Sequence, residues 1–300
     1  MSELDSRYKE KIAEILDTGA PVSPRGMKTR ELQASQLRLW DSSHNIITLV
    51  PRKLNYAFSV AEWLWMLFGR DDVRFVSSFN KNIANFSDDG VSFYGAYGPR
   101  IAEQLEYVYN CLKNDSDTRQ AIMTTWRPCP PKTKDVPCTL VFHFLIREGR
   151  LNLIVTMRSN DIWLGTPYDT FNFTQIQNFM AGMLGIPRGS YILTADSFHV
   201  YEQHWEQAKQ LTSVEPSVQD ARTNDIVFAK PGFHNYDRLR VAFDADVNDI
   251  LSGTSYTLFD QYPVGIREHV RLLTFYSRKD GSHRRAEFWD RIYAGDASGG

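Results

Sequence analysis

The sequence predicts an α+β fold, because segments with the periodicity of helices and of strands are mixed along the chain. The 300 residues are 42% hydrophobic and 13% aromatic, which is typical of a folded, enzyme-sized protein and not of a disordered chain. No internal repeat or low-complexity linker divides the sequence. We therefore expect one interwoven α+β domain over residues 1–300.

Helices are expected where apolar residues recur every three or four positions. These segments are residues 5–17, 58–68, about 99–112, 170–184 and about 201–211. The first would end at Gly19 and the second at Gly69, since glycine commonly follows the last helical residue. The third has Pro99 in its first turn, and the fourth is stopped by Gly185 and Pro187.

Strands are expected where apolar and polar residues alternate or where apolar runs are short. These runs are residues 120–126, 139–146, 151–158 and 190–196. Arg147–Arg150 joins two of them, and its Gly149 and charges suit a hairpin turn. A turn-rich segment follows the first helix at about residues 20–26. The last sixty residues show no clear pattern, and Asp296–Gly300 is expected to be a frayed end.

Charge and cysteine content narrow the class of protein. The net charge of −2 and the isoelectric point near 6.4 give no basic surface for bulk nucleic-acid binding. Cys111, Cys129 and Cys138 are odd in number and far apart, which argues against a disulfide framework and favours a reducing cytoplasm. The acidic start is not a leader, and the apolar stretch 56–68 is too short to span a membrane. We therefore expect a soluble cytoplasmic protein.

The segment from Arg158 to Asp169 has the composition of a ligand pocket. It reads Arg-Ser-Asn-Asp-Ile-Trp-Leu-Gly-Thr-Pro-Tyr-Asp, so a few polar groups stand among large apolar side chains. Arg158 ends an apolar strand and opens this string. Asp169 closes it, and its neighbours argue against a simple surface aspartate.

Two residues upstream are candidates for covalent and acid–base chemistry. Cys138 follows Pro137 at the start of an alternating strand, where a thiolate could attack an electron-poor ring carbon if nearby cations lowered its pKa. The alternative is a small buried hydrophobic residue. Glu62 lies among Trp and Leu residues, and burial would raise its carboxyl pKa toward neutrality, as a proton shuttle requires. Its alternative is a rim residue whose carboxylate reaches solvent.

Other polar residues are candidates for binding a phosphate and a sugar. Guanidinium groups match phosphate oxygens, and the candidates are Arg25, Arg119 and Arg158, with Ser159 as a hydroxyl donor. His199 and Tyr201 are two apart on a strand-like run and would face the same side. They could donate to a sugar hydroxyl, or His199 could be a core residue. No metal-binding, P-loop or dinucleotide-binding motif is present in the sequence.

These strings together resemble the active-site motifs of the thymidylate synthase family, in the family's order and near its spacings. The resemblance covers roughly residues 8–210, and the part after about 215 is poorly matched. It implies a mixed β-sheet flanked by helices, a sheet-to-sheet homodimer with shared active sites, and 5,10-methylenetetrahydrofolate as co-substrate without a metal.

The resemblance also implies a role for each candidate residue. Cys138 is similar to the nucleophile that adds to C6 of a pyrimidine, Glu62 to the relay carboxylate and Tyr94 to the tyrosine that assists proton removal from C5. The binding residues follow: Arg25, Arg158 and Ser159 for phosphate, Arg119 for phosphate of the partner subunit, Asp161 and Gly165 for the folate, and His199 and Tyr201 for the sugar 3'-hydroxyl.

Several positions depart from the synthases and resemble the phage deoxycytidylate hydroxymethylases. Thr139 follows the nucleophile where synthases have His, Met157 stands where they have Gln, and Asp169 replaces the Asn that reads uracil. A carboxyl group can accept from N4 of cytosine and, when protonated, donate to N3. Discrimination of this kind can be large, because the wrong base leaves buried polar groups unmatched.

Further departures concern the phosphate and the folate. Gln120 replaces the second arginine of the family's Arg-Arg pair. The indole over the folate is replaced by Ala84 or a near neighbour, and a missing wall there would admit water. The synthases' folate-closing C-terminal tail is not evident.

We therefore predict a (deoxy)cytidylate 5-hydroxymethyltransferase that converts dCMP to 5-hydroxymethyl-dCMP. The alternatives are a CMP 5-hydroxymethylase of nucleoside-antibiotic or antimetabolite synthesis, a cytidylate C5-methylase and a thymidylate synthase. A non-enzymatic nucleotide- or RNA-binding regulator is disfavoured by the presence of both Cys138 and Glu62.

Overall fold

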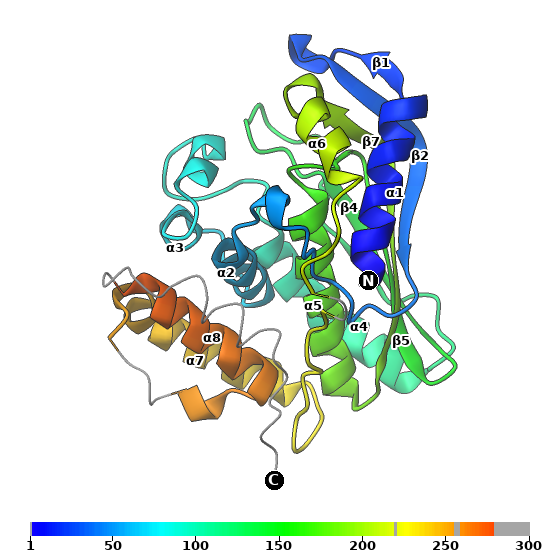
Figure 1. Cartoon of the computed structure of the whole chain (residues 1–300). Helices are drawn as coiled ribbons and strands as arrows, with labels where there is room; N and C mark the ends of the chain where they lie inside the picture. Colours follow the sequence, from blue (N-terminus) through cyan, green and yellow to red (C-terminus); the bar gives the residue numbers. More distant parts are fainter. Residues whose placement is uncertain (1, 219–220, 255–258, 279–300) are drawn as a thin grey trace.

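The computed structural model describes residues 2–218, 221–254 and 259–278, and Figure 1 shows how its elements are arranged. A mixed sheet has the strand order β1-β2-β7-β5-β4-β3, with β6 beside β7. The strands are Ala20–Val22 (β1), Thr29–Leu39 (β2), Ile122–Thr124 (β3), Thr139–Arg147 (β4), Arg150–Met157 (β5), Asn160–Asp161 (β6) and Arg188–Tyr201 (β7). The helices are Glu3–Thr18 (α1), Tyr56–Leu67 (α2), Val73–Ser77 (α3), Tyr97–Asn114 (α4), Thr166–Leu184 (α5), Trp205–Leu211 (α6), His234–Ser252 (α7) and Val264–Ser277 (α8).

The register of the central strands brings distant residues to one edge of the sheet. β5 and β7 are parallel, so the chain needs a crossover between them, and α5 provides it. α5 therefore begins beside the end of β5. β4 runs antiparallel to β5 with Thr139 opposite Met157, so β4 begins at the same edge. Residues around 138, 158 and 169 meet there for this reason.

The two faces of the sheet differ in burial. On β5, Leu151, Leu153, Val155 and Met157 are at most 1% exposed, and they join one core with α1, α2 and α5. The residues between them are only half-buried. Figure 1 shows the helices gathered on one side of the sheet. The opposite face is therefore not covered by any described helix.

Polar side chains fix α5 inside the protein although the helix is almost fully buried. Asn172 donates to Glu62 of α2, and Asn45 donates to Thr174. Gln177 donates to the carbonyl oxygens of Leu151 and Ser190, which belong to β5 and β7. Buried polar groups are costly unless they are hydrogen-bonded. These bonds therefore specify the position of α5 relative to the sheet and to α2.

Most of the expected elements are confirmed, with shifted ends. The helices at 5–17, 58–68, 99–112 and 170–184 correspond to α1, α2, α4 and α5, and the strands at 139–146, 151–158 and 190–196 to β4, β5 and β7. The strand at 120–126 is reduced to β3. The helix expected from 201 begins later, because β7 extends to Tyr201 and a short 3-10 turn precedes α6. Glu148 and Gly149 have φ of 54° and 70°, as the expected hairpin turn requires.

The sequence analysis missed the short elements β1, β6 and α3 and the longer elements β2, α7 and α8. β2 carries polar Glu31, Gln33 and Ser35 where an alternating strand would be apolar, and Ala34 interrupts it with φ of 50°. α7 and α8 pack against each other, and α8 also contacts α2. The expected frayed end at 296–300 lies outside the described residues.

Candidate active site

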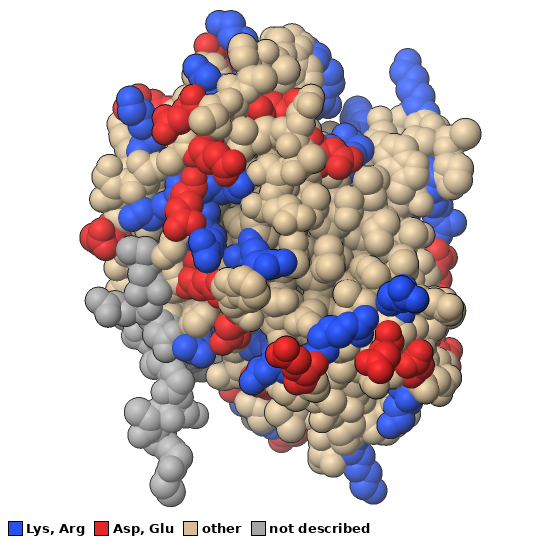
Figure 2. Space-filling model, turned by 90° about the vertical axis from the view of Figure 1, so that its right-hand side faces the viewer, with Lys and Arg blue, Asp and Glu red and all other residues tan. Residues whose placement is uncertain are grey.

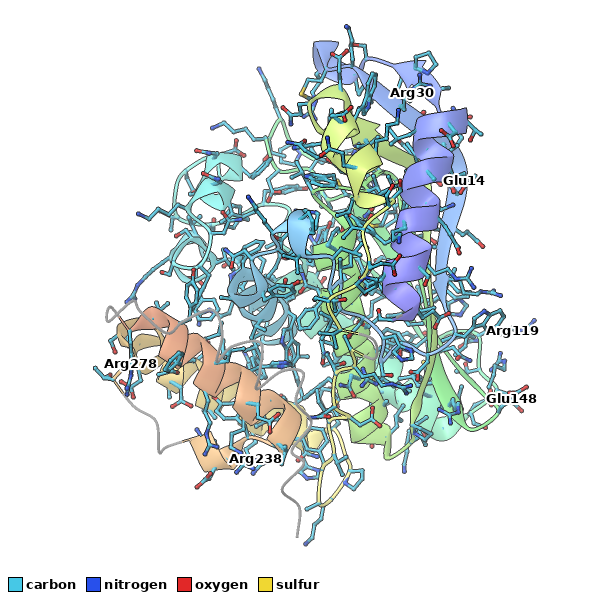
Figure 3. All side chains as sticks on the ribbon, viewed as in Figure 1. Glu14, Arg30, Arg119, Glu148, Arg238 and Arg278 are labelled. Carbon is cyan, nitrogen blue, oxygen red and sulfur yellow. The ribbon has the colours of Figure 1, made fainter. Side chains whose placement is uncertain are left out.

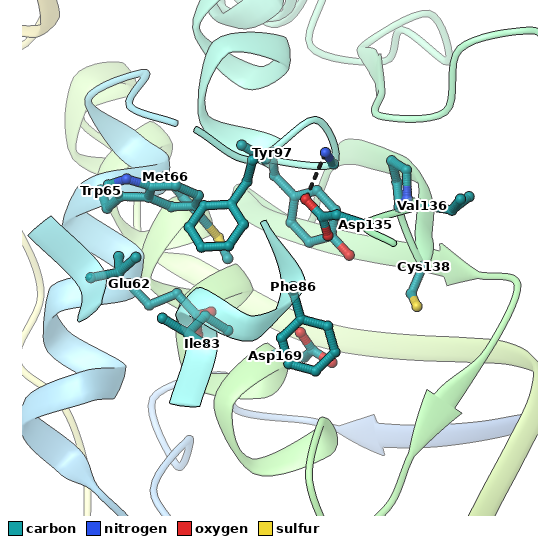
Figure 4. Close-up of a pocket in the computed structure, with 15 residues that line it drawn as sticks. Glu62, Trp65, Met66, Ile83, Phe86, Tyr97, Asp135, Val136, Cys138 and Asp169 are labelled. Carbon is teal, nitrogen blue, oxygen red and sulfur yellow. Dashed lines mark hydrogen bonds between the residues drawn. The ribbon is translucent and has the colours of Figure 1, made fainter. Parts of the chain in front are cut away.

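A cavity opens where α2, α4, α5 and the start of β4 meet, and Figure 4 shows the side chains around it. Its volume is about 670 Å³, including the part open to solvent. Three candidates that are far apart in the sequence line it together: Glu62, Cys138 and Asp169.

The loop that carries Cys138 is held by Arg158. The Arg158 Nε donates to the Pro137 carbonyl at 2.8 Å, and Nη2 donates to the Val136 carbonyl at 3.0 Å. The Arg158 amide also donates to the Cys138 carbonyl at 2.9 Å. Burial raises the pKa of the Cys138 thiol, and the positive charge of Arg158 opposes this only in part. The condition that nearby cations lower this pKa is therefore not met, because burial outweighs their charge.

Glu62 projects from α2 into the cavity, and its carboxyl group accepts a hydrogen bond from Asn172 Nδ2 at 2.6 Å. Burial, together with the charge of Asp169, raises the pKa of Glu62 to about 8. The carboxyl group can therefore hold or release a proton near neutral pH, and its role as a proton shuttle stays a prediction.

Asp169 lies in the first turn of α5, and its Oδ2 accepts from Asn160 Nδ2 at 2.8 Å. Burial raises its pKa to about 7, although the bond from Asn160 favours the ionised form. A Cβ at Gly165 would lie 3.1 Å from Asp169 Oδ2 and 3.1 Å from the Asp161 carbonyl. Gly165 therefore allows the tight approach of this strand-to-helix connection.

Tyr97 is a cavity residue that the sequence analysis missed. Its hydroxyl oxygen accepts from the Thr139 amide at 3.2 Å, directly beside Cys138. Tyr94 instead lies against Arg100, whose guanidinium carbon is 5.1 Å from the Tyr94 ring centre, and Tyr94 is not among the residues that line the cavity. The repeated Tyr-Gly in Tyr94–Gly98 was the available sequence signal for Tyr97.

Asp135 is a second cavity residue that was missed. It accepts from the Gly95 amide at 2.7 Å, and burial raises the pKa of its carboxyl group. A Cβ on Gly95 would lie only 2.4 Å from the Asp135 carbonyl. Glycine at this position therefore lets the loop before α4 close over the segment that leads to Cys138.

Asp161 and His199 are brought together by the pairing of β6 with β7. Asp161 Oδ1 accepts from the amides of Trp163 and Leu164 at 2.8 and 3.2 Å. Its Oδ2 is buried without a hydrogen-bond partner among the described residues, which leaves an acceptor for a ligand's N–H group. The His199 and Tyr201 rings are 5.2 Å apart on one side of β7, as their spacing predicted.

Of the residues expected to bind phosphate, Arg158 and Arg25 lie near Cys138, whereas Arg119 lies at the outer edge of the molecule. Arg158 contacts the loop that carries Cys138, and Ser159 follows it after the end of β5, but neither residue lines the cavity. Arg25 is exposed in a turn with φ of 53°, close enough for its charge to affect the pKa of Cys138. Arg119 is exposed between α4 and β3, and Figure 3 shows it at the outer edge of the molecule on the same side as Glu148. It does not line the cavity of its own chain.

The side of the cavity near Ala84 is lined by apolar side chains. Ile83 and Phe86, from the 3-10 helix Lys81–Phe86, line the cavity. The expectation of a missing wall is therefore wrong, although no indole from this segment lines the cavity. Phe86 is 55% exposed, so this side of the cavity remains accessible to water.

The described ranges hold no candidate metal-ligand group and no membrane-spanning helix. Residues 2–218, 221–254 and 259–278 contain no group of three or more His, Cys, Asp or Glu side chains arranged to hold a metal ion. No helix in the same ranges is long and apolar enough to cross a membrane. Cys111, Cys129 and Cys138 are free thiols.

Comparison with known proteins relates this chain to enzymes of nucleotide metabolism. A family model described as thymidylate synthase matches residues 6–223. The chain is 36% identical over 214 residues to a deoxyuridylate hydroxymethyltransferase of Bacillus phage SP01, which covers 65% of this chain and 56% of that protein. It is 34% identical over 171 residues to a deoxyuridylate hydroxymethyltransferase of Pseudomonas phage M6, covering 54% and 49%. A thymidylate synthase of Corynebacterium aurimucosum is 26% identical over 226 residues, covering 71% and 84%. The chain thus spans about half the length of the two phage relatives.

Proposed function

The chain belongs to the thymidylate synthase family, and from this premise we propose that it transfers a one-carbon unit to C5 of a pyrimidine nucleotide. The observation that carries the proposal is the meeting of Cys138, Glu62 and Asp169 in one cavity. A nucleophile, a proton carrier and a group able to read a base edge are the parts that this chemistry needs. 5,10-Methylenetetrahydrofolate would supply the carbon, and the free Oδ2 of Asp161 suits an N–H group of its pterin ring.

Cys138 would add to C6 of the base through its sulfur, which makes C5 nucleophilic. The raised pKa of this thiol means that the proton must be removed as the sulfur attacks. Glu62, with a pKa of about 8, can exchange protons at neutral pH. Arg158 holds the Cys138 loop and adds positive charge beside it.

Asp169 favours cytosine as the base. Addition of sulfur at C6 places negative charge on N3 of cytosine, and this charge must be neutralised. A carboxyl group with a pKa of about 7 is partly protonated at neutral pH and can transfer a proton to N3, while it accepts from N4. An amide can donate a hydrogen bond but cannot transfer a proton. We therefore favour dCMP as substrate.

We further propose that the product is hydroxymethylated, with dCMP, methylenetetrahydrofolate and water giving 5-hydroxymethyl-dCMP and tetrahydrofolate. Two relatives at 36% and 34% identity are named hydroxymethyltransferases. Phe86 is exposed at the edge of the cavity and leaves that side open to water, which the reaction would need. CMP as substrate, and a methyl product with hydride from the folate, are the alternatives.

A second candidate substrate is dUMP, because both phage relatives are named deoxyuridylate hydroxymethyltransferases. A protonated Asp169 could donate to O4 and accept from N3–H of uracil. The two substrates therefore differ in the direction of the hydrogen bonds that Asp169 must make.

We propose a homodimer that forms through the uncovered face of the sheet. Outward side chains in neighbouring strands, Val141, Ile154 and Ile192, are only half-buried in one chain. Figure 2 shows a broad uncharged area on this side of the molecule, bordered by charged residues. Arg119 lies outside the cavity of its own chain, which suits a residue donated to the phosphate site of a partner subunit.

Release of tritium from C5 tests the proposed chemistry. The protein would be incubated with dCMP or dUMP labelled at C5, with and without methylenetetrahydrofolate. Folate-dependent release is expected, faster with dCMP. A protein that only binds nucleotides would release none with either base, and this result would refute the enzymatic function.

A further inference from the structure

Among the described residues, the side chain of Asp169 has one side-chain hydrogen-bond partner, Asn160. Asn160 Nδ2 donates to Asp169 Oδ2 at 2.8 Å, and Asn160 is only 2% exposed. Asp169, which recognises the base in the proposed function, is thus held by Asn160, a residue to which the sequence analysis gave no role.

The orientation of the Asn160 amide is fixed by its other contacts. Its Nδ2 also lies 3.1 Å from Met157 Sδ, and a thioether sulfur can only accept. Its Oδ1 accepts from the hydroxyl group of Thr166, which is fully buried in the first turn of α5. Two acceptors face the amide nitrogen and one donor faces the amide oxygen. Turning the amide over would set its oxygen against the sulfur and the carboxyl group.

This orientation of the Asn160 amide determines which oxygen of a protonated Asp169 donates a hydrogen bond to the base and which accepts one. A carbonyl oxygen accepts a hydrogen bond better than the hydroxyl oxygen of the same acid. The Asn160 bond therefore favours the carbonyl at Oδ2 and the proton at Oδ1. Cytosine and uracil differ in which edge position offers a donor and which an acceptor. A carboxyl group with a fixed proton can match only one of them, whereas one with a mobile proton can match both.

We propose that Asn160, oriented by Met157 and Thr166, is a specificity-determining positioning residue that fixes the accepting oxygen of Asp169 and so restricts the enzyme to one pyrimidine base. The inference rests on the proposed function but holds for either base. It also gives a role to Met157, which stands where the synthases have Gln.

The test compares kcat/KM for dCMP and dUMP in the full-length wild type and in three variants. Asn160→Leu removes the donor at similar volume, Thr166→Val removes the orienting hydroxyl group, and Thr166→Ser keeps it. Losing one hydrogen bond that fixes the proton should reduce the ratio of the two kcat/KM values about tenfold in Asn160→Leu. Thr166→Val should shift the ratio in the same direction, and Thr166→Ser should retain it.

The binding of deoxyribose 5-phosphate, which lacks a base, separates this role from general damage to the site. Its inhibition constant should stay within about twofold of the wild-type value in every variant, because Asn160 acts only on base recognition. If Asn160→Leu does not fold, the Thr166→Val and Thr166→Ser pair decides.

An unchanged base ratio in folded, active Asn160→Leu and Thr166→Val would overturn the inference, as would a wild type that does not discriminate between the bases. A wild type that converts neither nucleotide would refute the proposed function instead. The inference would then be judged by the ratio of Kd values for dCMP and dUMP, with the same expected loss in Asn160→Leu.

Discussion

The pH dependence of stability provides a direct test of the environment of Glu62. Its pKa is about 8 in the folded protein, against an ordinary value of 4.5. Between these values the folded state holds a proton that the unfolded state has lost, so the free energy of unfolding falls as pH rises. At about 1.36 kcal/mol per pKa unit, the difference gives an upper limit of about 4 to 5 kcal/mol by pH 8.

Glu62→Gln removes this titration while an amide oxygen can still accept from Asn172. Urea unfolding of both proteins would be followed at pH 5 and pH 8, at one fixed protein concentration. The stability of the variant relative to wild type should increase by at least about 2 kcal/mol between these pH values. Glu106→Gln, at an exposed position of α4, is the control and should leave the pH dependence unchanged. Parallel curves for wild type and Glu62→Gln would refute the account of a half-buried Glu62 that holds a proton near neutral pH.

Three further predictions concern the reacting residues. Cys138→Ala should abolish turnover while the Kd for dCMP, measured by calorimetry, stays within about tenfold, because the thiol contributes little to ground-state binding; full activity would exclude covalent catalysis. Asp169→Asn should lower kcat/KM for dCMP by about 10²- to 10⁴-fold, the usual contribution of a general acid, and move the preference toward dUMP. An unchanged ratio of kcat/KM for dCMP to kcat/KM for dUMP would contradict the role of Asp169. The rate of Cys138 alkylation by iodoacetamide should reach half its maximum above about pH 8.5, the usual thiol pKa, because burial raises the pKa of Cys138. Arg158→Leu should move this midpoint to higher pH, because it removes a positive charge near the thiol. A midpoint below about pH 8.5 in wild type would show that the cations outweigh burial.

The parts of the site that depend on local pattern could be predicted from the sequence. Cys138 and Asp169 stand in strings whose mixture of apolar and polar residues is typical of a pocket, and the structure places both around one cavity. Their roles remain predictions. The spacing of His199 and Tyr201 was sufficient to place both on one side of a strand, because alternation in a strand is regular.

The parts that depend on tertiary packing could not be predicted. Tyr97 is directed into the cavity by the position of α4, and the repeated Tyr-Gly in Tyr94–Gly98 does not show which tyrosine lies there. The net upward shift of the Cys138 pKa results from burial in the folded protein, which a list of nearby cations does not give. β2 was missed because Glu31, Gln33 and Ser35 interrupt its apolar alternation, and because its pairing with β7 is long-range.

The mass of the product tests the central claim most directly. The protein would be incubated with methylenetetrahydrofolate and dCMP, CMP or dUMP, and the nucleotides would be separated and weighed by mass spectrometry. We predict that dCMP gains the elements CH2O, as hydroxymethylation requires, and that Cys138→Ala gives no new species. A gain of CH2 would indicate a methylase, and conversion of dUMP alone would contradict the reading of Asp169. No change in any of the three nucleotides would contradict the proposed reaction itself.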